Sequence, residues 1–163
     1  MKKPVKRLTP RRAKPEKRVR VPSRLSIATR HLIQPDESRP FYVALLLSPS
    51  RRQMLATIKF TGAPSHANDP RTMGMVRKYT SHADGRPVVR PGQIIAHMYL
   101  NGDDLRADAS NILPHECTHA AMAWATLQKA NLKNMEGEEV LCHAVGEMSR
   151  RVNQIAHMMG VWK

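Results

Sequence analysis

Hydrophobic residues occur in short runs through the first hundred positions and at helical spacing thereafter. The early runs are rich in β-branched and aromatic residues and are bounded by turn-forming residues, a pattern that predicts strands. We expect strands at residues 41–47, 55–60, 75–80 and 93–100, the third within a loop region rich in Gly, Pro, Asp and Asn from 62 to 91. Residues 23–33, with Ser23 as a cap and Pro35 beyond the end, are interpreted as a short helix.

After residue 101 the hydrophobic period changes from two to 3.6, which indicates a change from sheet to helix. Asp108, Ser110 or Asn111 can cap a helix that runs to about residue 129, with Pro114 in its first turn. A second helix is expected over residues 135–159, where the apolar residues Leu141, Ala144, Val145, Met148, Val152, Ile155 and Met159 recur at helical spacing. This order of elements predicts an α+β domain in which two helices pack beside a small, mostly antiparallel sheet.

The positive charge of the chain is concentrated at its N-terminus. Residues 1–24 contain eleven Lys and Arg residues against Glu16 alone, a net charge of +10. Because the whole chain carries +14, the remaining 139 residues carry +4, an ordinary value for a folded domain. The N-terminal segment also contains four prolines and almost no apolar periodicity, so it cannot bury enough surface to fold alone. We expect a basic disordered tail over residues 1–24 and one folded domain over 25–163.

Several classes of protein are disfavoured by the same composition. No apolar run approaches the ~18 to 20 residues that span a bilayer, and the basic N-terminus lacks the apolar segment of a secretory signal. Two cysteines, Cys117 and Cys142, are too few for a disulfide framework. We therefore expect a cytoplasmic protein without a membrane span, in which both thiols are reduced and neither is catalytic.

Candidate chemistry is concentrated in the sequence His115-Glu116-Cys117-Thr118-His119. Residues four apart on a helix lie about 6 Å apart along its axis on one face, so both imidazoles can bind one zinc ion. Glu116 is rotated about 100° from His115, where it can serve as general base toward a zinc-activated water in peptide hydrolysis. A shuffled chain of this composition contains about 0.016 such patterns, which favours a metal site over a helix with two surface histidines.

A catalytic zinc usually has three protein ligands, so a third must come from outside this motif. Glu138 and Glu139 are the leading candidates. If the apolar face of the second helix is buried, Glu138 lies nearer the edge of that face and Glu139 points away from it. An alternative interpretation of the acidic pair is a helix N-terminus, where the helix dipole favours negative charge.

The segment 139–146, EVLCHAVG, resembles the second zinc-binding helix of the thermolysin-like gluzincins. In that family a ligand glutamate lies beyond the second histidine at the spacing that separates Glu139 from His119, and an acidic residue one helical turn later orients a ligand histidine. The resemblance therefore implies Glu139 as the third ligand. His143 occupies the orienting position, although a neutral imidazole brings no negative charge there.

The predicted strand, the HECTHAAMAW helix and the GEEVLCHAVGEM helix together resemble the compact cores of small phage-encoded metallopeptidase-like proteins and of ImmA/IrrE-like proteins, over residues 93–159. This resemblance implies a minimal zincin-like fold, a zinc cofactor and a protein or peptide substrate. For a phage-encoded protein it also implies a location in the host cytoplasm. The metal helix further resembles that of the SprT/Spartan-type DNA-protein crosslink proteases, but no HGxxF-like segment supplies their third histidine.

His97 and Tyr99 lie on the predicted strand just before the metal helix. Zincins commonly place a strand along the substrate cleft, so either side chain could contact substrate or stabilise an oxyanion. A simpler interpretation is the ordinary alternation of a strand, with one face packed and the other solvated.

The basic tail supports a rival function of another class, a non-catalytic nucleic-acid-binding or capsid-associated factor. Its Lys and Arg side chains, between residues 2 and 24, could neutralise several phosphates and give a strongly salt-dependent affinity. The tail has no aromatic residue for base stacking, so sequence readout is not implied. Acidic proteins and anionic lipids are alternative partners for such a segment.

Overall fold

The computed structural model describes residues 28–36, 41–62, 69, 71–78, 82–83, 86–87 and 92–162. The predicted tail, residues 1–24, lies outside these ranges. The described chain is an α+β structure, as expected, and its elements are β1 (Thr29–Ile33), β2 (Tyr42–Ser48), α1 (Arg51–Phe60), β3 (Met75–Lys78), β4 (His82–Ala83), β5 (Arg86–Pro87), β6 (Ile94–Asn101), α3 (Gly102–Leu127) and α4 (Met135–Met158). None of the described helices is long and apolar enough to cross a membrane.

The main sheet has four strands in the order β1-β2-β6-β3. β1 pairs with β2 and β3 pairs with β6 in antiparallel fashion, whereas the two central strands, β2 and β6, are parallel. The sheet is therefore mixed, with antiparallel pairing at both of its edges. A separate two-stranded ladder joins β4 to β5.

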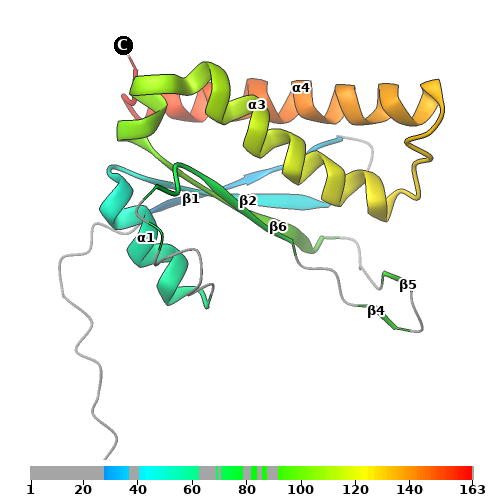
Figure 1. Ribbon diagram of the computed structural model, residues 1–163, viewed down its shortest axis with the longest axis horizontal. Coiled ribbons are helices and arrows are strands. Elements are labelled where there is room, and N and C mark those ends of the chain that lie inside the picture. The colour runs from blue at the N-terminus through cyan, green and yellow to red at the C-terminus, as the bar shows by residue number, and fades with distance from the viewer. Residues whose placement is uncertain are drawn as a thin grey trace, which may run out of the picture.

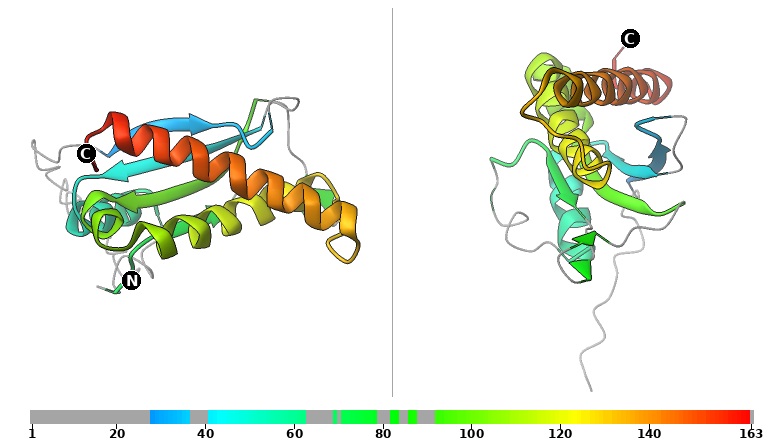
Figure 2. Two further views of the ribbon diagram at one scale, coloured as in Figure 1. Left: turned by 90° about the horizontal axis from the view of Figure 1, so that it is seen from above. Right: turned by 90° about the vertical axis from the view of Figure 1, so that its right-hand side faces the viewer.

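Helices cover both faces of the sheet (Figure 1). The larger apolar core lies between the sheet and the α3–α4 pair, while a smaller cluster of Met54, Ile58, Met75 and Tyr99 lies under α1 on the other face. α3 contacts β6 and β3, and α4 contacts β1. Seen from above and from the side, α4 lies next to α3 rather than over β3 (Figure 2). The edge of the sheet formed by β3 is therefore adjacent to α3 alone among the long helices.

Residues 55–60, predicted as a strand, belong instead to the helix α1, so this prediction is wrong. Ser50 caps the helix by accepting a hydrogen bond from the Gln53 amide, and Met54 and Ile58 face the sheet. These two residues are four apart, so they lie on one helical face and together bury the apolar stripe. A local cap and this spacing outweigh the strand propensity of the individual residues.

The predicted helix at 23–33 is also contradicted where the structure describes it. Thr29–Ile33 is the strand β1, and all five of its residues pair with β2, from Thr29 opposite Leu47 to Ile33 opposite Val43. Residues 23–27 lie outside the described ranges. Pairing with a neighbouring strand, which one sequence does not reveal, decides the conformation here.

α3, the helix that carries His115 and His119, begins earlier than predicted. Asn101, the last residue of β6, caps α3 through its side chain, which accepts from the Asp104 amide. Asp108 has non-helical dihedrals (φ −155°, ψ 55°) and interrupts the helix, and its carboxylate accepts hydrogen bonds from the side chains of Ser110 and Asn111. The predicted cap residues thus mark a kink inside α3. Pro114 is the sixth residue after that kink and therefore lies beyond the first turn.

The remaining predictions of secondary structure hold with small shifts of their bounds. The strands predicted at 41–47, 75–80 and 93–100 correspond to β2, β3 and β6. α4 begins after Asn134, which caps it by accepting from the Gly137 amide, and ends one residue before the predicted position.

Candidate metal centre

Two histidines face one another on the exposed side of α3. The Nε2 atoms of His115 and His119 are 3.2 Å apart, and their rings are nearly perpendicular, with an interplanar angle of 83°. Both side chains are exposed. The four-residue spacing on a helix produces this arrangement, because it places both Cβ atoms on one face.

The separation of these nitrogens fits a metal ion. Two imidazole nitrogens bound to one tetrahedral zinc at about 2.0–2.1 Å lie about 3.3 Å from each other, which follows from the tetrahedral angle. The observed 3.2 Å therefore needs little movement to admit zinc between the rings. Without metal, the same distance suits a hydrogen bond in which one ring donates and the other accepts.

The surroundings of His119 favour its neutral form, which metal binding requires. Partial desolvation lowers the pKa of this imidazole, and the nearby charges of His115 and Lys78 lower it further. Because ligands must be deprotonated before they bind a metal, a lowered pKa favours binding near neutral pH. Lys78 is the last residue of β3, so this effect also places the end of β3 close to the second histidine.

Glu116 points into the protein and lies against the backbone at Gly74, just before β3. It is only 5% exposed, and burial raises the pKa of its carboxyl to about 7. Its Oε2 atom is buried and has no hydrogen-bond partner among the described residues. A buried carboxylate without a partner is costly, and a general base is most effective when its pKa lies near the working pH. The environment of Glu116 is therefore suited to acid–base chemistry.

β3 provides the wall opposite Glu116. A Cβ atom built on Gly74, the residue before β3, would lie 2.8 Å from the Cγ and Oε1 atoms of Glu116. Val76 packs into the core that contains α3, whereas Met75 packs under α1, so the even-numbered residues of this strand face the metal helix. Sequence reasoning did not identify Gly74. Its only signal was a glycine at the start of a predicted strand, which indicates a close backbone approach without naming its partner.

His97 and Tyr99 do not face this site. Tyr99 is fully buried in the cluster under α1, on the sheet face opposite α3, and its hydroxyl lies 2.7 Å from Thr61 Oγ1. His97 lies within 3.4 Å of the same hydroxyl through its Nδ1 atom. The structure thus supports the simpler interpretation of this strand, in which both side chains serve packing and hydrogen bonding.

The structure does not bring Glu139 or His143 to the two histidines. Both are exposed on α4, as is Glu138. Within the described part of the chain, no three His, Cys, Asp or Glu side chains gather closely enough to hold a metal ion. Among the described residues, the structure brings His115 and His119 together without a third side chain of these types placed to bind the same ion.

The packing of α4 explains this separation. The thiol of Cys117 interacts with the Ser149 side chain, which fixes the register of the two helices. Cys117 is rotated about 200° from His115 around α3, so α4 lies on the side of α3 away from that histidine. Glu139 is ten residues before Ser149, which corresponds to about 15 Å along the axis of α4. Ligation by Glu139 would require α4 to move.

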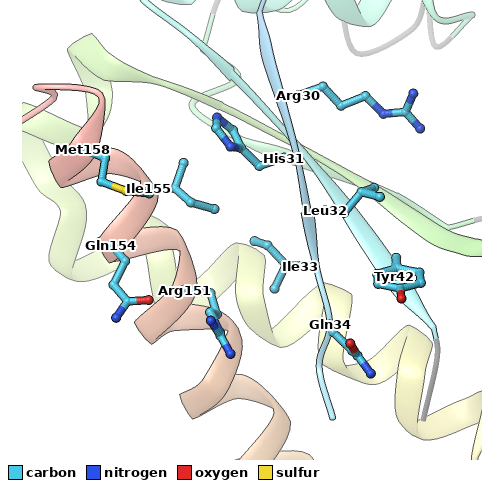
Figure 3. A pocket seen from close by; sticks show the side chains of 10 residues that line it. All are labelled: Arg30, His31, Leu32, Ile33, Gln34, Tyr42, Arg151, Gln154, Ile155 and Met158. Carbon is cyan, nitrogen blue, oxygen red and sulfur yellow. The ribbon is translucent and has the colours of Figure 1, made fainter. Parts of the chain in front are cut away.

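A groove lies at the other edge of the sheet, between β1 and the last turns of α4 (Figure 3). Its volume is about 670 Å³, and its charged lining residues are Arg30 and Arg151. Figure 3 shows His31 and Ile33 pointing toward α4 and Arg30 pointing away from it. Because β1 and β3 are opposite edges of the sheet, this groove is separate from the two histidines.

Comparison of the chain with protein-family models, with curated proteins and with solved structures finds no match. Any statement about its function therefore depends on its own residues and their geometry.

Proposed function

We propose that this chain is a zinc-dependent metallopeptidase of the HExxH type, built on a minimal zincin-like domain. His115 and His119 are the two ligands and Glu116 is the general base. The observation that carries this proposal is the 3.2 Å separation of the two Nε2 atoms, which matches the edge of a zinc tetrahedron. The burial of Glu116 beside this pair supports the role of the carboxylate.

Bound zinc would supply a Lewis acid that lowers the pKa of a coordinated water from 15.7 to roughly 7. Glu116 would accept a proton as a water molecule attacks the peptide carbonyl, and would return that proton to the amine when the C–N bond breaks. In the described sheet β3 is an edge strand, so an extended peptide could align beside it by strand addition. A peptide in that position would pass close to Glu116.

Glu139 remains our sequence-based prediction for the third ligand, with His143 as the residue that would orient a ligand. Zinc content measured by mass spectrometry on protein purified without added metal tests both assignments. We expect about one zinc per chain in the native protein, as for a single mononuclear site. The metal should be lost in His115→Ala and His119→Ala and retained in His157→Ala, which removes an exposed histidine of α4.

The glutamate variants separate the remaining roles. Glu139→Ala loses zinc if Glu139 is the third ligand, whereas zinc retained in this variant removes Glu139 from the ligand set. Glu116→Gln should retain zinc but lose peptide hydrolysis, because an amide cannot accept the proton. Zinc lost from Glu116→Gln would contradict the assignment of Glu116 as a base that is not a ligand.

A second candidate function is nucleic-acid association through the basic tail, either in a SprT-like DNA-associated protease or in a non-catalytic phage factor. The net charge of +10 within residues 1–24 favours it. Binding of full-length protein to duplex DNA should weaken with salt with a log-log slope of about −0.9 per phosphate contacted. Replacement of the tail Lys and Arg residues by Gln should remove this dependence. Salt-independent binding, or no binding at low salt, would exclude this role.

A further inference from the structure

The backbone at Gly74 approaches the side chain of Glu116 so closely that any other residue at position 74 would require the Glu116 side chain to shift. A Cβ atom at position 74 would be 2.8 Å from Cγ, 2.8 Å from Oε1 and 2.9 Å from Cδ of Glu116. Real Cβ atoms essentially never come within 3.0 Å of a heavy atom in a residue that is not their own or a chain neighbour. Gly74 is not among the glycines with positive φ. Position 74 therefore requires glycine because of this contact with Glu116 and not because of its backbone conformation.

Gly74 cannot easily withdraw from Glu116, because both of its neighbours are anchored. The carbonyl oxygen of Met73 accepts a hydrogen bond of 3.1 Å from Asn101 Nδ2, and Asn101 is fully buried. On the other side, Met75 pairs with Tyr99 in the β3–β6 ladder. The peptide backbone at position 74 is thus fixed between a buried side-chain anchor and a strand pairing.

The anchor itself is held in one orientation. Asn101 Oδ1 accepts from the Asp104 amide at 2.9 Å, and its Nδ2 also donates to Asp104 Oδ2 at 2.7 Å. Rotation of the Asn101 amide by half a turn would place an acceptor against both the Met73 carbonyl and the Asp104 carboxylate. Arg51 donates to the same carboxylate at 2.8 Å from its Nε atom. Fixed hydrogen-bond partners of this kind are what hold a neighbouring functional group in place.

We propose that Gly74, anchored through Asn101, is a positioning residue for the carboxylate of Glu116. The inference depends on the proposed function for its catalytic meaning, but not for its geometry. The backbone at Gly74 forms a wall against which the carboxylate lies, at the junction of α3 and β3. A side chain at position 74 would push this carboxylate away from the place it holds against the backbone, while leaving the two imidazoles on the exposed side of α3 unchanged.

A double-mutant cycle tests the contact without reference to activity. Gly74→Ala should lower the urea midpoint of unfolding in the native background but leave it unchanged in a Glu116→Ala background, where Cγ, Cδ and both oxygens are absent. Gly146→Ala is the matched control, because a Cβ atom there meets nothing within 4 Å. This control should not lower the midpoint in either background.

Zinc content and hydrolysis then test the functional meaning. Gly74→Ala should retain the zinc of the native protein but hydrolyse peptides about 10²-fold more slowly, as expected when a catalytic group is displaced by about 1 Å. Gly146→Ala should match the native protein in both measurements.

The outcomes separate this inference from the proposed function. Equal loss of stability from Gly74→Ala in both backgrounds would refute the contact with Glu116. A free-energy coupling between positions 74 and 116 in the cycle, together with unchanged peptide hydrolysis by Gly74→Ala, would refute the positioning role of Gly74. Absence of zinc from the native protein would overturn the proposed function and with it the catalytic role of Gly74, and the cycle would still decide whether the contact exists.

Discussion

The guanidinium of Arg51 forms two hydrogen bonds to the carboxylate of Asp104 and thereby joins α1 to the first turn of α3. Burial alone would raise the pKa of Asp104, but the hydrogen bonds from Arg51 and Asn101 outweigh it, and the pKa is lowered. The two helices cover opposite faces of the sheet, so this ion pair closes the end of the domain at which the metal helix begins.

Removal of the Asp104 carboxylate should therefore be costly. We expect Asp104→Ala to lower the free energy of unfolding by about 2–4 kcal/mol, because Asn101 and Arg51 lose a charged acceptor in a buried position. Urea unfolding provides the measurement. Asp103→Ala is the control, since its carboxylate is 55% exposed and its pair with Arg106 lies at the surface. That change should cost less than about 1 kcal/mol, and equal costs would contradict a special role for Asp104.

The stability of the metal-free protein should depend on the protonation of Glu116. Burial raises the pKa of this group from 4.5 to about 7, so the protonated form is favoured in the folded state. The contribution of the protonated carboxyl to the free energy of unfolding is fully present below pH 4.5 and is lost as the pH rises to about 7. The loss should be on the order of 3 kcal/mol. Urea unfolding of the metal-free native protein and of Glu116→Gln should be compared between these two pH values. The difference between the two profiles isolates the contribution of Glu116, because residue 116 of the variant cannot titrate. Identical pH profiles would show that Glu116 is not perturbed.

Zinc should stabilise the native fold through the two histidines. A ligand that binds only the folded state at a free concentration 100 times its dissociation constant adds about 2.7 kcal/mol to the free energy of unfolding. Thermal unfolding with and without zinc should show a higher midpoint for the native protein and for His157→Ala. His115→Ala and His119→Ala should show no shift. A shift that persists in both histidine variants would place the metal elsewhere.

The two thiols should differ sharply in reactivity. Cys117 is buried and its pKa is raised to about 11, chiefly by burial, whereas Cys142 is exposed. Because the thiolate is the reactive form, one thiol per chain should react with a maleimide or a disulfide reagent at pH 8 in the folded protein, and two after unfolding. Cys142→Ser should remove the fast reaction. A fast reaction that remains in this variant would show that α3 and α4 separate readily.

Sequence patterns predicted the elements whose signals are local. The helical periods before and after residue 130 and the strands at β2 and β6 are all encoded within a few neighbouring residues. Segment 55–60 is helical although its β-branched and aromatic residues favour a strand, because the Ser50 cap and the shared burial of Met54 and Ile58 on one helical face decide its conformation. β1 could not be predicted, since its conformation depends on a partner strand.

The candidate site also combines features set by local spacing with features set by long-range packing. Helical spacing predicts that His115 and His119 face one another, and they do so in the structure. The wall at Gly74 depends on how β3 pairs with β6, and the position of Glu139 depends on the register between α3 and α4. Both are long-range relationships, which no motif within one segment contains. A resemblance based on spacing along the chain could propose Glu139 as a ligand without determining which side of α3 would face it.

The parallel pairing at the centre of the sheet also sets an order of assembly. Val43 of β2 pairs with Ala96 of β6, 53 positions further along the chain, so the four-stranded sheet is complete only when the ends of a long loop have met. Such closure costs chain entropy and slows folding, whereas a helical hairpin such as α3–α4 needs only local contacts. We expect the two imidazoles to be presented on their helix early, and the wall at Gly74 to be added only after β6 is in place. A newly made chain would then be able to capture metal before its base is held in position.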